Sequence, residues 1–492
     1  MSLKKKFYVT TPIYYANGAP HIGHAYTTII ADILARWHKI LGEEVFFLTG
    51  TDEHGLKIQQ SAEKAKKNPK KFVDEISEEF KKTWKNLDID YDNFLRTTDP
   101  EHVRAVQKVL SELHDKKLIY KGKYEASYCI GCEQYKTKNE IDDKGCCTLH
   151  KTPVIMKKEE AYLFRMSKFQ KDLLKVIEKN AFEIIPKERK NEIAYFLKEN
   201  KLQDISISRP KSEVEWGIEL PFDSEQTCYV WIDAFMNYLT GLGYPSSEKF
   251  KRYWPADVQL MSKDILRVHA TIWPSMLLSL NLKLPKKLFI HGYFTINGEK
   301  MSKSLGNFID PNKLVRQYSS DIVRYFIIRH IPLGHDGDFS ESALKDRHNN
   351  ELANKLGNLV SRISGMCKGK IPESSIDEEL ISKLKLTEIV AHMNNIELDK
   401  ALSEIFAFID SCNEYVQQKQ PWTLSGKEKE KILYSLADSI RVISILLYPF
   451  MPSTSEKINS QFEFEKPDIK NAKFGLTKSA KIKKADILFQ KS

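Results

Sequence analysis

Two histidines near the start of the chain have the type and spacing that phosphate chemistry requires. They lie in His21-Ile22-Gly23-His24, after an Asn17-Gly18 turn, where a helix is expected to begin. The apolar residues that follow recur at helical spacing: Ile29, Ile30, Ile33, Leu34, Trp37 and Leu41. Unpaired backbone N–H groups and the helix dipole favour an anion at a helix N-terminus, and Gly23 leaves room for a base or sugar. A core pair or half of a metal site are the alternatives.

A second phosphate-binding candidate is a pair of lysines far along the chain, in Lys300-Met301-Ser302-Lys303-Ser304. An apolar strand is expected at 288–296, and an Asn297-Gly298 turn separates it from the lysines. Ammonium groups on flexible stems in a loop of small residues could reach the far side of a nucleotide held by the histidines. The alternative is a solvated basic loop in a lysine-rich chain.

Four cysteines lie close together in the sequence and suit a metal. Cys129 and Cys132 form a Cys-x2-Cys pair, and Cys147 forms a Cys-x2-His pair with His150. Three thiolates and one imidazole make a tetrahedral structural zinc site that leaves no position for water. We prefer Cys147 to the adjacent Cys146, because Cys147 keeps the two-residue spacing to His150. Unligated cysteines in a loop are the alternative.

The elements that must position these residues predict an α/β fold. A short strand at 7–9, a helix after His24 and a buried strand at 45–48 form a right-handed βαβ unit. This unit begins a doubly wound, Rossmann-type parallel sheet. Ligands of such sheets bind at the carboxyl ends of the strands, where the histidine turn and Asp52 both fall. A helix cap is the alternative role for Asp52.

Helical periodicity replaces the strand signals in the last third of the chain, and an all-α helical bundle is expected there. Its apolar positions include Leu398, Ala401, Leu402, Ile405, Phe406, Ile409, Ile440, Ile443, Leu446 and Leu447. Asn358 and Arg362 share one helical face, and Trp422 follows Pro421. Asn and Arg can read base edges, and an indole can stack on an unpaired base. The alternative for Trp422 is burial in the core.

Composition narrows the class of protein. The 492 residues suggest about three domains, and 76 basic against 66 acidic residues give a net charge of +10, which suits a polyanionic partner without requiring one. No apolar run is long enough to span a membrane, and the first strand begins too soon for a signal or transit peptide. Seven cysteines, an odd number, favour a reducing compartment, so we expect a cytoplasmic protein.

The histidine and lysine segments resemble the two signature motifs of class I aminoacyl-tRNA synthetases, and further matches make the whole chain similar to the methionyl-tRNA synthetase family. The resemblance implies a methionine-tRNA ligase. Such an enzyme joins L-methionine and ATP to form methionyl-adenylate and then transfers the methionyl group to the 3′-terminal ribose of tRNA(Met). It also implies Mg²⁺ with the ATP and one structural zinc per chain.

The resemblance assigns roles to individual residues. The catalytic residues would be His21 and His24 on the α-phosphate side and Lys300 and Lys303 on the β and γ side. ATP would be bound by these four residues together with Gly23, Asp264 and Ser302. Methionine would be bound by Ile13, Tyr15, Asp52, Trp231, Ala234, Tyr238, Ile265, His269 and Trp273, with Asp52 facing the ammonium group and aromatic faces suiting the thioether. The anticodon would be read by Asn358, Arg362 and Trp422.

Two places depart from the family pattern. Ser262 stands where most relatives are expected to carry glycine, and Arg267-Val268 replaces a more aromatic pair. Both lie beside Asp264 and His269, so they bear on the shape of this wall of the site. Without the resemblance, His269 would be interpreted as a core histidine.

The resemblance also divides the chain into domains. The two halves of the catalytic domain are expected at 1–117 and 221–294, and between them lies a connective insertion with a zinc knuckle, 118–220. The lysine-loop domain that contacts the tRNA stem would span 295–349, and the anticodon-binding domain 350–492. The chain ends without the extra oligonucleotide-binding domain that some members use to dimerise, so we expect a monomer.

Rival functions remain. Synthetases for valine, isoleucine or leucine need a large editing domain, which the small insertion does not provide. A synthetase for cysteine would be expected to place zinc in its amino-acid pocket, whereas the cysteine segment of this chain is expected outside the catalytic sheet. A non-catalytic tRNA-binding protein descended from a synthetase is the alternative outside the enzymes, and the intact histidines and lysines weigh against it.

Overall fold

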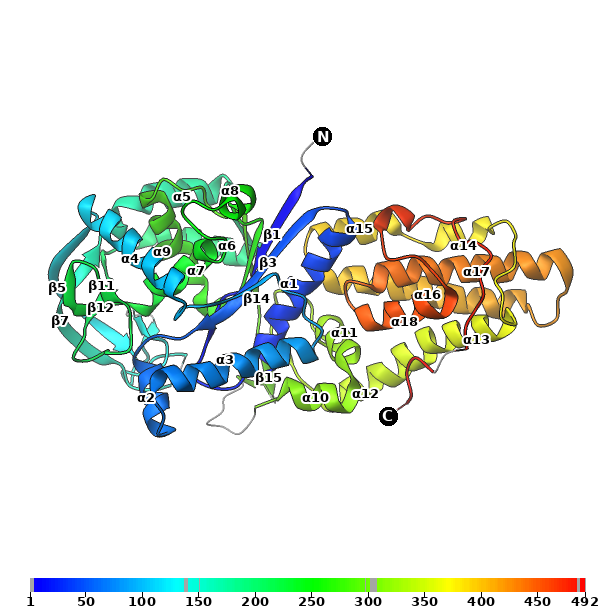
Figure 1. Ribbon diagram of the computed structural model, residues 1–492, viewed down its shortest axis with the longest axis horizontal. Coiled ribbons are helices and arrows are strands. Elements are labelled where there is room, and N and C mark those ends of the chain that lie inside the picture. Colours follow the sequence, from blue (N-terminus) through cyan, green and yellow to red (C-terminus); the bar gives the residue numbers. More distant parts are fainter. Residues whose placement is uncertain are drawn as a thin grey trace.

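The molecule has an α/β half at one end of its long axis and a helical half at the other (Figure 1). The structure is a computed structural model, and it describes residues 4–136, 140–149, 151–296, 298–300, 308–484 and 487–491. The predicted combination of a parallel-sheet domain followed by a helical bundle is confirmed. The sheet half supplies the ends of strands on which a site can be built.

A seven-stranded sheet organises the α/β half. Its order is β2-β3-β1-β13-β14-β8, with β4 paired to β3, and every pairing is parallel. The strands are β1 (Lys6–Thr10), β2 (Tyr14–Tyr15), β3 (Glu44–Asp52), β4 (Asn93–Arg96), β8 (Glu183–Ile185), β13 (Val258–Ser262) and β14 (Lys287–His291). The strands β1 and β13 are neighbours at the middle of the sheet. The chain continues from β1 to β3 on one side of this pair and from β13 to β14 on the other. Ligands of such sheets bind where this reversal occurs, at the carboxyl ends of β1 and β13.

Helices cover both faces of this sheet. Helix α1 (Ile22–Ile40) connects β1 to β3 and belongs to one apolar core, and α9 (Leu266–Ser279) connects β13 to β14 and belongs to another. Helix α1 is buried along most of its length because it also packs against α11 (Ser320–His330), which precedes the helical half. The other helices of this half are α2 (Leu56–Lys64), α3 (Pro69–Asn86), α4 (Pro100–Asp115), α7 (Val230–Thr240) and α8 (Glu248–Tyr253).

The segment between β4 and β12 carries two small antiparallel sheets. One contains β5 (Ile119–Cys129), β6 (Gln134–Tyr135), β7 (Ile155–Phe164) and β9 (Ile205–Ser206), and the other β10 (Ser208–Pro210), β11 (Glu219–Leu220) and β12 (Asp223–Cys228). Helices α5 (Gln170–Glu178) and α6 (Lys187–Glu199) flank β8. The range 118–220 therefore contains a strand of the central sheet as well, and the domain boundaries remain a prediction.

The expectation of one strand over 288–296 was wrong. The chain forms β14 up to His291 and then a separate strand, β15 (Phe294–Ile296), which pairs with β16 (Glu299–Lys300) and β17 (Gly337–Asp338). The break falls at Gly292, where a Cβ atom would lie 2.2 Å from the carbonyl oxygen of His335. Only glycine lets the backbone pass this close, so the strand ends there.

The helical half is the bundle that the periodicity predicted. It follows α10 (Pro311–Tyr318), α11 (Ser320–His330) and α12 (Glu341–Arg347), and consists of a π-helix (His348–Gly357), α13 (Asn358–Met366), α14 (Glu378–Lys383), α15 (Leu386–Asn394), α16 (Leu398–Lys419), α17 (Gly426–Leu447) and α18 (Pro452–Phe462). Among the described residues, no helix combines the length and apolar character that a membrane span requires.

A buried arginine joins the two halves. Arg324 on α11 is fully buried, and its Nη2 lies 2.6 Å from Oδ2 of Asp32 on α1. Its guanidinium also donates to the carbonyl oxygens of Phe450 and Pro449 beyond α17, each at 2.9 Å, and to that of Leu87 after α3 at 3.3 Å. Each donor needs such an acceptor, because an unpaired buried charge is costly. Three separate segments are therefore tied to one side chain.

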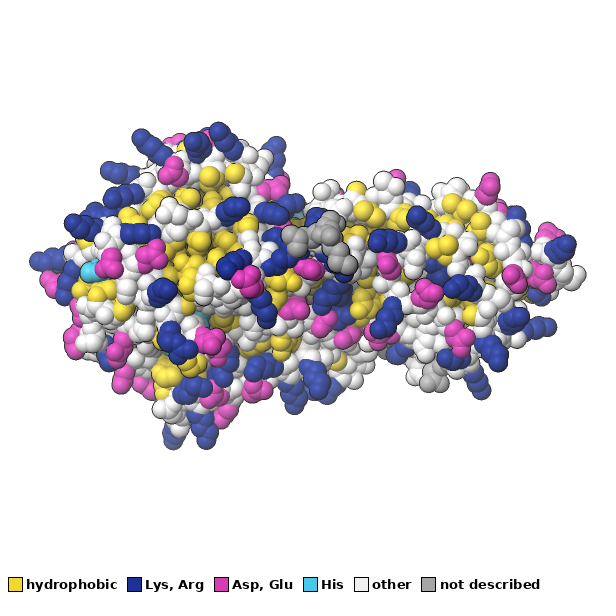
Figure 2. Space-filling view, turned by 45° about the horizontal axis from the view of Figure 1, so that its top comes forward, with side chains coloured by type: hydrophobic (Ala, Val, Ile, Leu, Met, Phe, Trp, Pro, Cys, Tyr) yellow, Lys and Arg dark blue, Asp and Glu magenta, His cyan; other side chains and the backbone are white. Residues whose placement is uncertain are grey.

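Charge is distributed over both halves. On the face shown in Figure 2, Lys and Arg side chains are interspersed with Asp and Glu along the whole length of the molecule. The net positive charge is therefore not gathered into one patch on this face, and the site has to be located from its geometry.

Candidate active site

A cleft of about 670 Å³ opens at the carboxyl ends of the central strands, where the strand order reverses. The structure brings together on its walls most of the residues that the sequence singled out: Ile13, Tyr15, His21, Gly23, His24, Asp52, Trp231, Ala234, Tyr238, Asp264, Ile265 and His269. These come from β2, β3, α1, α7 and the start of α9, or from the turns beside them. One cleft therefore holds groups suited to a phosphate, a cation and an apolar side chain.

The two histidines are fixed by the backbone at the start of α1. Nδ1 of His21 accepts from the backbone N–H of Gly23 at 3.0 Å, and Nδ1 of His24 accepts from that of His21 at 3.2 Å. A ring nitrogen that accepts a hydrogen bond carries no proton, so both rings are the Nε2–H tautomer. The rings stack with centroids 3.7 Å apart. The Nε2–H groups of the two rings are thus neutral hydrogen-bond donors at the positive end of a helix, an arrangement that suits a phosphate.

The segment after the predicted lysine loop packs on this helix start. The backbone N–H of Ile22 donates to the carbonyl oxygen of Ile309 at 3.1 Å, and the Phe308 ring lies edge-on to His21 with centroids 6.0 Å apart. Phe308 also lines the cleft, although the sequence gave no signal for it. Ser302 and Lys303 lie outside the described residues, as does the side chain of Lys300, so their roles remain predictions.

The buried carboxyl of Asp52 is chemically suited to a cation. It ends β3 opposite Tyr15 of β2, is 8% exposed, and its Oδ1 has no hydrogen-bond partner among the described residues. Burial raises the pKa of its carboxyl well above the usual value, and the nearby carboxylates of Asp233 and Glu133 raise it further. A bound primary ammonium would supply both the missing donor and the missing positive charge. The helix-cap alternative is not supported, because the N-cap of α2 is Gly55.

The pocket beside Asp52 has aromatic walls and a neutral histidine. Nδ1 of His269 lies 2.9 Å from the carbonyl oxygen of Ile265, which can only accept, so Nδ1 carries the proton and Nε2 accepts from the Tyr238 hydroxyl at 2.8 Å. Burial lowers the pKa of His269 to about 4, so the ring is neutral at physiological pH. Trp231 and Phe235 meet this ring edge-to-face. These surfaces suit a thioether and exclude a charged side chain.

Trp273 is not brought to the cleft. It is fully buried one helical turn beyond His269, where it stacks on Phe235 with centroids 5.7 Å apart and donates from Nε1 to Oε1 of Gln259 at 3.1 Å. Helical spacing places it on the same side of α9 as His269, but α7 covers it. In this structure Trp273 supports the residues that form the wall.

The departures from the family pattern have partners of their own. The Ser262 hydroxyl donates to Oδ1 of Asp264, which glycine could not do. Arg267 is not among the residues that line the cleft; it pairs with the carboxylate of Glu140 and donates to the carbonyl oxygen of Tyr135 at 3.2 Å. Val268 is buried. Each of these residues is therefore accommodated in this chain by contacts of its own or by burial.

Sequence reasoning missed two side chains at the end of β14. His291 lines the cleft, and burial lowers its pKa to about 4. It accepts at Nε2 from the Thr27 hydroxyl at 2.7 Å, because its Nδ1 donates to the carbonyl oxygen of Gly292. Tyr293 also lines the cleft; burial and then the Asp264 carboxylate raise its pKa. Their place at the carboxyl end of a central strand was the available signal.

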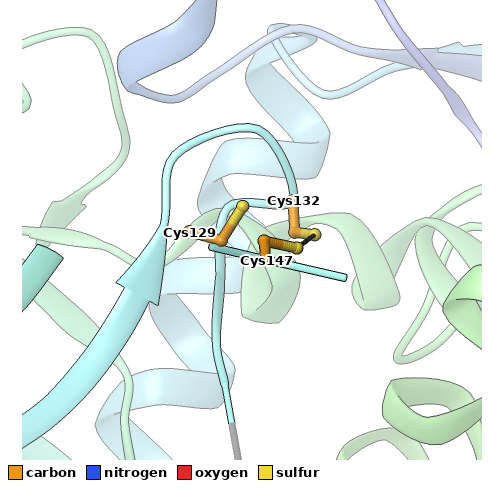
Figure 3. A group of neighbouring side chains, drawn as sticks. All are labelled: Cys129, Cys132 and Cys147. Carbon is orange, nitrogen blue, oxygen red and sulfur yellow. Dashed lines mark hydrogen bonds between the residues drawn. The ribbon is translucent and has the colours of Figure 1, made fainter. Parts of the chain in front are cut away.

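Three thiols form a group that could hold a metal ion. Figure 3 shows Cys129, at the end of β5, together with Cys132 and Cys147. Their sulfur atoms lie within 4.8 Å of one another, and those of Cys132 and Cys147 are 3.7 Å apart. Zinc–sulfur bonds of about 2.3 Å in a tetrahedron place thiolates roughly 3.8 Å apart, so this donor set fits zinc. Cys146 lies outside the group, with its sulfur 3.9 Å from the carbonyl oxygen of Lys144, and His150 lies outside the described residues.

The candidate base-reading residues meet on the helical half, apart from the cleft. Trp422 is 50% exposed, so the alternative of a buried Trp422 was wrong. The Arg362 guanidinium lies 5.7 Å from the centroid of its indole ring. Asn358 is exposed on α13, one turn before Arg362. An exposed indole beside an arginine and an amide offers a stacking surface with polar groups at its edge.

Comparison with known protein families covers almost the whole chain. The family model described as tRNA synthetases class I (M) matches residues 7–148 and 138–364. The model described as the anticodon binding domain of methionyl tRNA ligase matches residues 369–492. The join between the two models falls at residues 364–369, near the end of α13 in the helical half.

Individual proteins that are similar to this chain carry names that match these two family models. The methionine-tRNA ligase of Caldanaerobacter subterraneus subsp. tengcongensis is 45% identical over 508 residues, which cover 99% of this chain and 79% of that protein. The ligase of Thermotoga maritima is 44% identical, with coverage of 94% and 76%. The structure of Mycobacterium tuberculosis methionyl-tRNA synthetase in complex with methionyl-adenylate superposes with a TM-score of 0.94 at 35% identity, covering 99% of both chains. The apo form of the same enzyme gives a TM-score of 0.87 at 32% identity, covering 99% of this chain and 98% of that one.

Proposed function

The chain belongs to the class I methionyl-tRNA synthetases, and from this premise we propose that its cleft joins L-methionine to tRNA(Met) in two steps. The methionine carboxylate attacks the α-phosphorus of ATP to form methionyl-adenylate, and pyrophosphate leaves. A hydroxyl of the 3′-terminal ribose of the tRNA then attacks the methionyl carbonyl, and AMP leaves. The Mycobacterium tuberculosis enzyme, whose structure superposes with a TM-score of 0.94, was solved in complex with methionyl-adenylate, which supports this assignment. The non-catalytic alternative is not favoured.

One observation carries the proposal: three complementary subsites share a single cleft. The Asp52 carboxylate oxygen that has no partner within the described part of the chain would take the ammonium group of methionine, and the pocket at the neutral His269 would take its side chain. The methionine carboxylate would then lie toward the helix start that carries His21 and His24. An amino acid and an α-phosphate held in this way are positioned for direct attack.

Catalysis would rest on positioning and on stabilising charge at phosphorus. The Nε2–H groups of His21 and His24 would donate to oxygens of the α-phosphate as negative charge builds up, with the helix dipole adding to the effect. Because both Nδ1 atoms already accept from the backbone, the rings stay donors in one fixed tautomer. Lys300 and Lys303 would neutralise the β and γ phosphates, and Asp264 would hold the ribose. Mg²⁺ arriving with ATP would offset charge on the phosphate oxygens.

The proposal includes a structural zinc and a base-reading surface. Cys129, Cys132, Cys147 and His150 would hold one zinc, and four protein ligands leave no position for a reacting water. Asn358, Arg362 and Trp422 would read the anticodon of tRNA(Met). The odd number of cysteines, three of which form the thiol group, favours the cytoplasmic location that we propose. A monomer remains our prediction, and light scattering would test it.

Amino-acid-dependent exchange of pyrophosphate into ATP tests the proposed reaction directly. We expect exchange with methionine and, among the common amino acids, with no other at a comparable rate. Lys303→Ala should lower the exchange rate roughly 10²–10³-fold, because it removes a charge that the transition state needs. Lys313→Ala, on an exposed position of α10, is the matched control and should change little. Exchange without any amino acid, or tRNA binding without exchange, would contradict the proposal.

A further inference from the structure

The metal-binding segment touches three elements that build the amino-acid pocket. We define the knuckle as the described residues 129–136 and 140–149, which include the three thiols. Its neighbours are α2, which follows Asp52, α7, which carries Trp231, and α9, which carries His269. Each of these contacts is made by a specific side chain.

The first contact is a helix cap supplied by Glu133. The N-cap residue of α2 is Gly55, which has no side chain, and Oε1 of Glu133 accepts from the backbone N–H of Lys57 at 2.9 Å instead. Glu133 is 5% exposed. A Cβ atom at Gly55 would lie 2.8 Å from Oε2 of Glu133 and 2.7 Å from the Tyr15 hydroxyl. The residue next to Cys132 therefore fixes the turn that leads away from Asp52.

The second contact uses the backbone of the same residue. The Tyr229 hydroxyl donates to the carbonyl oxygen of Glu133 at 2.6 Å, and both groups are buried. Tyr229 is the N-cap residue of α7, whose first turns carry Trp231 and Ala234. The position of Glu133 thus bears on the aromatic wall of the pocket as well as on the turn after Asp52.

The third contact comes from α9. Arg267 lies two residues before His269, donates from Nη2 to the carbonyl oxygen of Tyr135 at 3.2 Å, and pairs with the Glu140 carboxylate. Both partners belong to the knuckle. By contrast, His21 and His24 are held by backbone groups of their own helix start. The knuckle is therefore attached more closely to the amino-acid side of the cleft than to the phosphate side.

We propose that Glu133 and Arg267 are positioning residues through which the metal-held knuckle sets the shape of the methionine pocket. The inference rests on the proposed function, since it assumes a zinc held through Cys132 and methionine at Asp52. A metal that fixes Cys132 also fixes the backbone of Glu133, and with it the cap of α2 and the anchor of Tyr229. Loss of the metal then weakens methionine binding while ATP binding is kept.

Binding measured without catalysis tests this inference. We expect Glu133→Ala to raise the dissociation constant for methionine about tenfold in calorimetry, because the hydrogen bond that caps α2 beside the pocket is lost. Glu133→Gln should recover most of the affinity, since its amide oxygen can accept from Lys57. The zinc content of both variants and their affinity for ATP should match those of the unchanged protein. Glu192→Ala, at an exposed position of α6, is the matched control.

Removing zinc with a chelator separates the possible outcomes. The metal-free unchanged protein should lose methionine affinity at least as strongly as zinc-loaded Glu133→Ala does. Metal-free Glu133→Ala should bind methionine no more weakly than the metal-free unchanged protein. Arg267→Ala should act in the same direction, and it decides the matter if Glu133→Ala fails to fold. Methionine affinity within about twofold of the unchanged protein in the variants, or effects of chelation and substitution that multiply, would overturn the inference. Absence of methionine binding in the unchanged, zinc-loaded protein would instead contradict the proposed function.

Discussion

Replacing Asp52 with asparagine removes the negative charge that its carboxyl carries when deprotonated and keeps the shape of the side chain. In the empty protein the Asp52 carboxyl has a raised pKa, because it is buried and lies near Asp233 and Glu133. Its Oδ1 has no partner among the described residues, so no hydrogen bond at that atom is lost. The substitution therefore tests one interaction, the attraction between this carboxylate and the ammonium group of methionine.

The magnitude follows from the burial of the pair. Truncating one member of a buried, hydrogen-bonded charge pair costs about 2–5 kcal/mol, and we expect the lower part of that range because asparagine still accepts one hydrogen bond. A loss of about 2–3 kcal/mol corresponds to a dissociation constant roughly 30–150-fold higher. Titration calorimetry with methionine in the absence of ATP measures it.

The pH dependence gives a second, independent signature. Below its raised pKa, Asp52 is protonated, and the ammonium group must displace that proton to bind. The affinity for methionine should therefore fall by about tenfold for each pH unit below that pKa and level off above it. The Asp52→Asn variant should lose this slope and the release of a proton on binding, which calorimetry in buffers of different ionisation enthalpy reports.

The same pKa has a consequence for the stability of the empty protein. A carboxyl whose pKa is higher in the folded than in the unfolded state favours folding at low pH, and this contribution is lost as the pH rises through the folded-state value. Asp52→Asn should therefore raise the melting temperature of the empty protein at neutral pH. Asp90→Asn, an exposed carboxylate on the same half of the molecule, is the control. Methionine affinity within about threefold of the unchanged protein, or an unaltered pH slope, would refute the reasoning.

Three further predictions concern other parts of the molecule. Trp422→Ala should weaken tRNA charging by roughly 1–3 kcal/mol in kcat/KM while leaving pyrophosphate exchange unchanged, because the exposed indole is lost as a stacking surface; an equal fall in both activities would contradict this. Cys147→Ser should remove most of the zinc found by elemental analysis, whereas Cys146→Ser should keep it, because only Cys147 lies in the thiol group; the reverse result would exchange their roles. Arg324→Met should lower the free energy of unfolding by about 3–5 kcal/mol in a urea titration, since buried carbonyl groups and Asp32 lose their donors; an unchanged midpoint would show that these groups find other partners.

Features that depend on local pattern could be predicted from the sequence. The helical spacing after His24 and the apolar strands at 7–9 and 45–48 correspond to α1, β1 and β3, and the periodicity near the C-terminus corresponds to α16 and α17. The position of Asp52 at a strand end placed it in the cleft, because the carboxyl ends of parallel strands meet at one edge. The Cys-x2-Cys spacing likewise located two of the three grouped thiols.

Features that depend on contacts between distant segments could not be predicted in this way. Trp273 has the helical spacing of a pocket residue, but α7 covers it, and only the packing of two helices decides this. The strand expected at 288–296 breaks because the backbone at residue 335 passes close to Gly292. Glu133 lies in a loop of the knuckle and has no motif of its own, although it caps α2. The charge of a side chain can be read from sequence, but its partner cannot.

The guanidinium of Arg324 has a consequence for what this chain can accept as a substrate. Because its donors are shared between α1 and the backbone beyond α17, the bundle cannot swing relative to the cleft without stripping a buried charge of its acceptors. These contacts therefore oppose a change in the span from the exposed indole of Trp422 to the paired imidazoles. A polynucleotide therefore has to match this span in its dimensions, as well as in its sequence, before it can occupy the surface at Trp422 and the cleft at the same time.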